Sequence, residues 1–314
     1  MDFGRRPAVL IRTGLLVGAA GVLLAAAPPL LAEMRWLAAG PERDQALVEG
    51  PGECLALPAE AGLRQSVEVG RAAFRSPLVL GGPAARAGLS CDSCHRDGRS
   101  NRLFQFPGVS GPPGTADVTT SRFSSHRGNG VDDPVAIPDL SGPKAALKVS
   151  QDPARRDLPR FIEGLITEEF DGPPPSPAVL EGLAAYVRTL DPAACPAGGR
   201  LRSAAGLLED ATRAVAAGQT ALSQGDTATA LTMIAAARSG LGRIDERYAG
   251  LEASRAALRR ADKALAAAAG AVRAGAPDAA EQLAAWRPEG LAATLERDAP
   301  ASLFNPARLA QHTP

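Results

Sequence analysis

Residues 91–95 read Cys-Asp-Ser-Cys-His, and this pentapeptide, the CXXCH motif, constrains the chain more than any other part of its sequence. Two thiols at this spacing can add to both vinyl groups of a haem while the imidazole of the next residue reaches the iron. The motif therefore predicts one covalently bound haem c, attached through Cys91 and Cys94, with His95 as an iron ligand.

Two other interpretations of the motif are a zinc half-site and a redox dithiol. A zinc site needs two further ligands, and the remaining candidates contain no second closely spaced pair. A thioredoxin-like dithiol needs a strand and a helix around it, whereas glycine-rich sequence flanks this motif. The haem interpretation is therefore favoured. The remaining cysteines and histidines are Cys54, His126, Cys195 and His312.

The N-terminus carries the pattern of a bacterial export signal. Three arginines within the first 12 residues precede an uncharged apolar run over residues 13–32, and Ala32 offers a small residue at a cleavage position. Residues 1–32 are predicted to be a cleaved signal peptide or, alternatively, an uncleaved anchor, since about 20 apolar residues can cross a bilayer. In both cases the rest of the chain is expected in the periplasm, soluble or tethered to the inner membrane.

Length and charge leave room for two domains and exclude one class of partner. The 314 residues are 45% apolar, and the 34 basic and 34 acidic side chains cancel, so no nucleic-acid partner is expected. The expected segments are an extended lead-in over 33–54, a haem domain over 55–197, a helical coiled-coil-like domain over 200–276 and a helical tail over 277–314.

Helices and long loops alternate in the predicted haem domain. Apolar positions predict helices over 61–74 and 158–170, and a third helix is predicted from its cap at Ser176 to about residue 190. The glycine- and proline-rich sequence over 81–160 predicts long loops. Loops of that length are unusual in a compact domain, and a bound cofactor would give them something to wrap around.

Beyond residues 198–199 alanine becomes frequent, and large apolar residues recur every seven positions. This spacing predicts two long helices packed face to face, with a shorter helix that begins after residues 224–226, as an antiparallel hairpin or a three-helix arrangement. The first series is Leu201, Leu208, Val215 and Leu222, and the second is Ile244, Leu251, Leu258, Leu265 and Val272.

The chain resembles the class I cytochromes c beyond the motif itself. In that family a Gly and a Phe four apart on the first helix cross a Leu and a Tyr three apart on the last helix. Here Gly70 and Phe74 precede the motif. Leu183 and Tyr186 follow it. The resemblance implies an all-α, cytochrome c-like domain in which the small glycine lets the two helices approach closely.

A narrower resemblance links residues 70–78 and 88–95 to the first haem domain of bacterial di-haem cytochrome c peroxidases. Those proteins carry a second CXXCH motif, and none occurs in these 314 residues. The two-haem electron path of that family therefore cannot exist within this chain. Together the two resemblances cover about residues 62–190.

The sixth ligand of the iron is open. Class I cytochromes usually supply a Met before the last helix, but all three methionines of this chain lie outside the predicted haem domain. His126 is the only other histidine there, and it is the predicted ligand, in a loop expected to cover the iron. The alternatives are a five-coordinate iron and ligation by Lys144, by Lys148 or by a Met from elsewhere.

Cys54 and Cys195 are the two thiols that remain once the haem has taken its own pair. They bracket the predicted haem domain, and in an oxidising compartment they are predicted to form a disulfide. The alternative is two free thiols.

These features predict an electron-transfer protein that works with a periplasmic redox partner. The C-terminal helices carry no catalytic constellation and are predicted to dock another protein. The alternative is a peroxidase-like enzyme that reduces peroxide at an open iron site, with Glu168, Glu169 or Asp171 as its acid–base group. Contact with a membrane is expected only through an uncleaved N-terminal segment.

Overall fold

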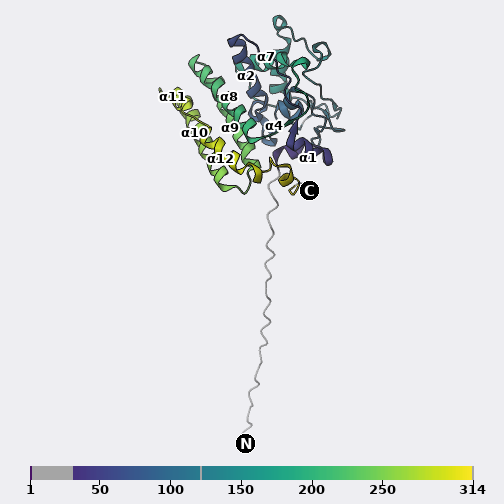
Figure 1. The fold of residues 1–314 in the computed structure, drawn as a ribbon. Coiled ribbons are helices and arrows are strands. Elements are labelled where there is room, and N and C mark those ends of the chain that lie inside the picture. Colours follow the sequence, from purple (N-terminus) through teal and green to yellow (C-terminus); the bar gives the residue numbers. More distant parts are fainter. Residues whose placement is uncertain (2–30, 121, 313–314) are drawn as a thin grey trace.

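A computed structural model describes residue 1, residues 31–120 and residues 122–312 (Figure 1). The chain is 59% helix and 4% strand, with no closed sheet, which confirms the all-α class. Within the described residues, no helix is both long and apolar enough to cross a membrane. The predicted signal peptide or anchor lies almost entirely outside the described residues.

Short elements surround the motif, and long helices follow it. The helices of the first part are α1 (Pro41–Val48), α2 (Ala61–Phe74), α3 (Pro77–Leu80), α4 (Gly82–Ala87), α5 (Cys91–Cys94), α6 (Asp157–Gly164) and α7 (Pro177–Thr189). Those of the second part are α8 (Ala204–Ser223), α9 (Thr227–Arg247), α10 (Glu252–Ala274), α11 (Ala279–Ala284), α12 (Glu289–Asp298) and α13 (Pro306–Leu309). Single turns are η1 (Ala32–Trp36), η2 (Arg96–Gly98), η3 (Lys144–Ala146), η4 (Pro153–Arg155), the π-helical η5 (Leu165–Glu169), η6 (Pro192–Ala194) and η7 (Ala299–Ala301). Two antiparallel strand pairs join β1 (Glu49–Gly50) to β4 (Arg200–Leu201) and β2 (Thr115–Ala116) to β3 (Val135–Ala136).

Helices α2 and α7 cross at the residues that the sequence predicted. A Cβ atom added to Gly70 would lie only 1.9 Å from the carbonyl oxygen of Gly182, so the two backbones touch where Gly70 lies. One turn further along, the rings of Phe74 and Tyr186 pack with centroids 5.0 Å apart. Leu183 lies beside them and is 2% exposed. The predicted helix crossing is therefore confirmed, with Gly182 as the residue that the sequence analysis did not name.

Polar side chains fix the starts of both crossing helices. The carboxylate of Glu60 accepts hydrogen bonds from the backbone N–H groups of Gly62 and Leu63 at the start of α2. The hydroxyl of Ser176 accepts from the N–H of Val179 at the start of α7, as predicted. Each cap satisfies donors that have no partner within the helix, so both crossing helices have a defined start.

The C-terminal helices adopt the three-helix alternative, with three corrections. The second apolar series does not belong to one helix, because the chain leaves α9 at Arg247 and turns through Gly250, whose φ is +80°, before α10 begins. The helix between the two series is not short, since α9 has 21 residues. Leu201 is not helical either: it lies in β4 with 71% of its surface exposed. Apolar residues spaced seven apart can belong to one continuous helix or to two helices joined by a turn, and the spacing alone does not tell the two apart.

The predicted extended lead-in is partly wrong. Residues 33–54 contain most of η1 and all of α1, because Pro41 begins a helix well and acidic side chains in its first turn suit the helix dipole. This segment is also buried against the other end of the chain. Its apolar residues form a small core with the C-terminal tail, made of Leu31, Leu37, Leu47, Leu303 and Leu309.

The two halves of the molecule pack against each other. Helices α8 and α9 lie beside α2, as Figure 1 shows. The amide of Gln65 on α2 donates to the carbonyl of Ala217 on α8 at 3.0 Å, and the hydroxyls of Ser176 and Thr229 are 2.7 Å apart. Met233 is fully buried in the core that contains the α2–α7 crossing. The C-terminal helices therefore cover one side of the unit that holds the motif.

Candidate functional site

The motif folds as a single helical turn with both thiols free. Ser90 caps α5: its side chain bonds the backbone N–H of Ser93, whose hydroxyl accepts from the N–H of Ser90 at 3.0 Å. This reciprocal cap places Cys91 and Cys94 three residues apart on one turn, and both are partly buried against the core. Two side chains at this spacing lie on the same side of a helix, as attachment to one planar group requires.

The surroundings of the thiols favour the protonated form of both cysteines. Burial raises the pKa of Cys91 to about 12 and moves the pKa of Cys94 further in the same direction. Reactive dithiols show the opposite shift, because a nearby positive charge or a helix N-terminus favours the thiolate. The redox-dithiol interpretation of the motif is therefore disfavoured.

The imidazole of His95 is held in one orientation by a backbone carbonyl. Its Nδ1 lies 3.0 Å from the carbonyl oxygen of Pro138. A carbonyl can only accept, so Nδ1 carries the proton and Nε2 keeps its lone pair. Burial lowers the pKa of His95 to about 4, against the opposing effect of Pro138, so the ring is neutral at pH 7. A neutral imidazole with a free Nε2 and a bonded Nδ1 is the form that ligates metals.

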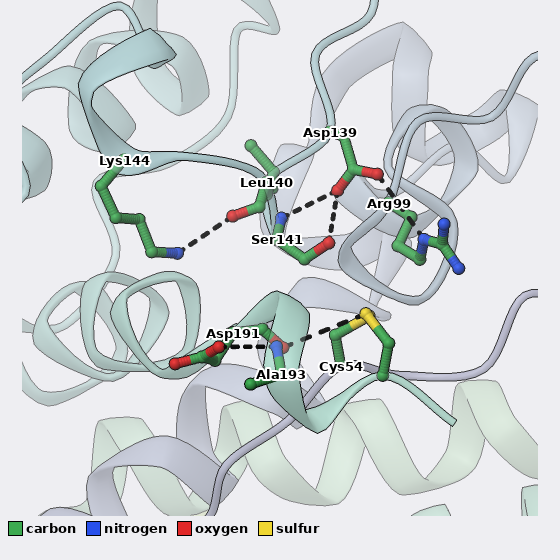
Figure 2. The surroundings of a disulfide bond; sticks show 9 residues. Cys54, Arg99, Asp139, Leu140, Ser141, Lys144, Asp191 and Ala193 are labelled. Atoms are coloured by element: carbon green, nitrogen blue, oxygen red, sulfur yellow. Dashed lines mark hydrogen bonds and ion pairs between the residues drawn. A yellow bond between two sulfur atoms is a disulfide. The ribbon is translucent and has the colours of Figure 1, made fainter. Parts of the chain in front are cut away.

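Several contacts hold the carbonyl of Pro138 in place. The backbone N–H of Leu140 donates to Gly98, three residues after His95, at 3.1 Å. On the other side, the ammonium of Lys144 donates to the carbonyls of Leu140 and of Val187 on α7, each at 3.0 Å; Figure 2 shows the bond to Leu140. The loop that orients His95 is thus anchored both to the motif and to the last helix of the crossing.

A turn centred on Asp139 stiffens the same loop. One carboxylate oxygen accepts from the backbone N–H and the hydroxyl of Ser141, at 2.9 and 2.6 Å, and the other lies 3.5 Å from the guanidinium of Arg99 (Figure 2). Pro138 was absent from the sequence analysis, and Lys144 was considered only as a ligand. The sequence Pro-Asp-x-Ser did indicate a turn at this place, but no neighbouring residue indicated that the turn would contact His95.

The surroundings of the thiols are apolar in the way that a haem ring requires. Partly buried side chains from the long loops, from α6 and from the end of η5 pack against the same core as Cys91 and Cys94. The macrocycle is largely apolar, so residues of this kind fit its faces. These side chains are Phe106, Val118, Leu140, Val149, Ile162 and Phe170.

The predicted disulfide is confirmed. Cys54 and Cys195 are bonded with an S–S distance of 2.05 Å, and they close a sequence separation of 141 residues (Figure 2). The backbone N–H of Asp191, just after α7, donates to the carbonyl of Cys54 at 2.8 Å. The bond therefore ties the segment before α2 to the segment after α7, at the ends of the two crossing helices.

His126 lies on a different loop and has a different partner. Its Nδ1 is 3.0 Å from a carboxylate oxygen of Asp171, and 64% of its side chain is exposed. The structure thus pairs His126 with Asp171 and not with His95. Ligation of an iron by His126 stays a prediction.

The loop around His126 is joined to three acidic residues. Arg127 forms ion pairs with Glu168 and Glu169, the second at 3.7 Å, and Asp171 accepts from the N–H of Ser125. Glu169 is 9% exposed, and its Oε2 is buried with no hydrogen-bond partner among the described residues. Burial raises the pKa of Glu169, although Arg127 acts in the opposite direction. The three acidic residues named from the sequence therefore meet at one loop, and Arg127 is the member that was missed.

A buried polar network, also unforeseen, supports the crossing helices. The hydroxyl of Tyr186 donates to Glu53 at 2.7 Å, and the same carboxylate pairs with Arg71 and Arg75 of α2. Burial alone would raise the pKa of Glu53, but the two arginines and Tyr186 lower it below its usual value. The network joins the residue next to the disulfide to both crossing helices.

Comparison with models of protein families, with curated proteins and with solved structures found no match to this chain. Within the described residues, no group of three or more histidine, cysteine or acidic side chains is arranged to hold a metal ion.

Proposed function

We propose that this chain is an exported c-type cytochrome with one haem, and that it transfers electrons in the periplasm. The observation that carries the proposal is the combination of two free thiols on one helical turn with an adjacent imidazole whose Nδ1 is held by Pro138. The α2–α7 crossing supports assignment to a cytochrome c-like fold. A bound haem would supply a one-electron couple of its iron.

Each part of the site has a separate task in this proposal. Cys91 and Cys94 would hold the haem covalently, and His95, with its Nδ1 bonded to Pro138, would offer Nε2 as a ligand to the iron. The Pro138 carbonyl keeps the imidazole from rotating, and Lys144 anchors the loop that carries Pro138 through the carbonyls of Leu140 and Val187. Fixed ligand geometry limits the rearrangement that accompanies a change of redox state, which suits an electron carrier.

The test is covalent retention of haem. Expressed with export and haem-ligation machinery, the protein should be red, and the haem should stay with the polypeptide after extraction with acidified acetone. The Cys91→Ala/Cys94→Ala double variant should lose covalent haem. The matched control Cys54→Ser/Cys195→Ser removes two thiols outside the motif and should retain it. Haem that extracts from the unchanged protein, or a polypeptide that acquires none, would contradict the proposal.

The iron's sixth ligand is proposed to be His126, which requires it to leave Asp171. A histidine in place of a Met would keep the reduction potential below that of a His/Met cytochrome. His126→Ala should then give a high-spin spectrum and faster cyanide binding, whereas Met233→Leu, in the buried core, should leave the spectrum unchanged. A low-spin spectrum that survives the loss of His126 would reject this ligand.

A second candidate function is peroxide reduction, and the buried Glu169 is the observation that favours it. A carboxyl group with a raised pKa and an unpartnered oxygen, beside Arg127, has the character of an acid–base catalyst. If the protein turns over peroxide, Glu169→Gln should lower the rate at least tenfold. The control Glu168→Gln changes a neighbouring carboxylate that is 53% exposed and should have little effect. Absence of turnover in the haem-loaded protein would reject the enzyme.

The location and partners follow from the same proposal. An exported cytochrome of this type would exchange electrons with a periplasmic redox protein. The C-terminal helices remain the proposed docking surface for a further protein, on the faces that do not cover α2. The N-terminal segment, if it is uncleaved, would tether the protein to the inner membrane.

A further inference from the structure

A cavity of about 730 Å³ lies where the motif segment meets the C-terminal helices. Its walls come from α2, from the motif segment at Asp92 and Arg96, from the chain around β4, and from α9. The cavity faces the side of the motif that does not carry the two thiols or His95. Its volume lies in the range of small-molecule binding sites, which is roughly 300–1,000 Å³.

Many charged side chains line the cavity together with apolar ones, and most of its arginines are paired. Arg71 and Arg75 bond Glu53, while Arg213 bonds Asp210. Three further arginines share one carboxylate, that of Glu33; they are Arg96, Arg202 and Arg247. These pairs bring wall segments together and leave few donors for a ligand.

Two arginines of the wall have no such pair: Arg200 in β4, which is exposed, and Arg243 on α9, which is partly buried. No hydrogen bond or ion pair joins the guanidinium of Arg243 to another described residue, and its Nε is buried without an acceptor. Asp92 and Asp210 are the acidic groups that act most strongly on the pKa of Arg243, but neither forms an ion pair with it within 4.0 Å. Burial lowers the pKa of Arg243, yet a guanidinium stays charged in proteins. The Arg243 side chain as a whole is only partly buried, so its terminal N–H groups are charged donors without an acceptor at the cavity wall, and an anionic oxygen would complement them.

Two further features of the cavity describe the rest of the ligand. Ser239, one turn before Arg243 on the same face of α9, also lines the cavity and offers a hydroxyl. Three large apolar side chains of the wall are exposed rather than packed: Leu57 at 47%, Leu78 at 56% and Leu201 at 71%. Exposed apolar side chains at a cavity with a charged interior suit a molecule with a polar head and a hydrocarbon tail.

We propose that this cavity binds a small organic carboxylate with a hydrocarbon chain. The planar guanidinium of Arg243 receives the two carboxylate oxygens side by side, which is the geometry that arginine offers and lysine does not. The chain lies against the exposed leucines at the opening. The site uses neither thiol nor His95, so it is independent of the proposed haem.

Titration calorimetry on the intact protein tests the proposal, with octanoate, acetate, octylamine and inorganic phosphate as probes. Octanoate should bind with a stoichiometry of one, acetate at least tenfold more weakly, and octylamine without detectable heat. Arg243→Gln should weaken octanoate binding at least tenfold. The matched control Arg238→Gln lies on the same helix, where its side chain pairs with Asp262 outside the cavity, and should bind octanoate like the unchanged protein.

Three results would overturn the proposal. These are an absence of octanoate binding, equal octanoate affinity in the Arg243→Gln protein, and phosphate binding as tight as that of octanoate, which would indicate a site for inorganic oxyanions. If Arg243→Gln unfolds, Arg243→Lys keeps the charge without the planar fork and should still weaken octanoate binding. Unchanged octanoate affinity in that variant would also reject bidentate binding.

Discussion

Replacement of Gly70 by alanine is the sharpest test of the helix crossing. The new methyl carbon would lie 1.9 Å from the carbonyl oxygen of Gly182, 2.2 Å from its carbonyl carbon and 2.7 Å from the backbone nitrogen of Leu183. All three atoms belong to the backbone of α7, so no side-chain rotation can relieve the clash. To reach even a contact of 3.0 Å, the two helices must separate by about 1.1 Å at this point.

The cost follows from that separation. A gap of roughly 0.5–1 Å forfeits a quarter to a half of each dispersion contact across it, and the Phe74–Tyr186 ring pair lies one turn away. Overpacking costs about 1–3 kcal/mol, and a clash between two backbones belongs at or above the upper end of that range. Alanine recovers about 1 kcal/mol of helix propensity over glycine. The expected net loss is about 2–3 kcal/mol in the free energy of unfolding, or about 3–5 °C in melting temperature for a chain of this length.

Urea and thermal unfolding, followed by far-ultraviolet circular dichroism, measure this loss. Gly270→Ala is the control, because an added Cβ meets nothing within 4 Å there and the glycine lies inside α10. That variant should gain up to about 1 kcal/mol. The stability of Gly182→Ala should lie between those of Gly70→Ala and Gly270→Ala, since its added Cβ would lie 2.8 Å from the carbonyl oxygen of Ser66. A Gly70→Ala protein as stable as the unchanged one would refute the close crossing.

Three further predictions concern the disulfide, the carboxylate of Glu33 and the start of the exported chain. Loss of the bond between Cys54 and Cys195 should lower the free energy of unfolding by about 2–5 kcal/mol in urea titrations, because the unfolded chain is freed over a long loop; no change would show that the bond does not constrain the unfolded state. Glu33→Gln should cost about 3–5 kcal/mol at pH 7, because three arginines lose their shared partner. Burial opposes ionisation of Glu33, but the arginines hold its pKa well below the usual value. The stabilisation that ionised Glu33 contributes is therefore complete above about pH 5 and fades as the pH falls below about 4. The difference in the free energy of unfolding between Glu33→Gln and the unchanged protein should shrink over the same range. A difference that does not change with pH would contradict the pairing of Glu33 with the arginines. Finally, Leu31 is 2% exposed in the small core that joins both ends of the chain, so the mass of the exported protein should include this residue, and a mature chain that starts at residue 33 would contradict its structural role.

The parts of the fold that follow from local sequence were predictable. Helix α2 was predicted with its observed bounds, and Ser176 was predicted as the cap of α7, because apolar spacing and capping are properties of a few neighbouring residues. The motif needed no structure to be found, since its chemistry depends on residues one to four apart. The Gly70–Phe74 pair was found through the family resemblance, and no periodicity would have singled it out.

The remaining parts depend on contacts between distant residues. Pro138 orients His95 across 43 positions of sequence, and Glu53 meets Tyr186 across 133. Nothing local to either residue indicates such a partner. The turn at Gly250 was missed for a related reason, because the apolar spacing continued across it although the chain reversed direction. Sequence patterns report which face of an element is buried, and they do not report which element covers it.

A buried cluster of ion pairs sets the position of the C-terminal helices relative to the motif, whereas close backbone packing sets the crossing of α2 and α7. Glu33 receives guanidinium groups from three segments: Arg96 directly after the motif, Arg202 at the start of the helical half and Arg247 at the end of α9. Buried ion clusters add little net stability, because desolvation offsets most of their attraction, but a misplaced segment leaves charges unpaired. Packing between α2 and α8 holds the halves together. The Glu33 cluster then selects one alignment among those that would bury similar area, and it thereby fixes where the Arg243 side of the cavity lies relative to the motif.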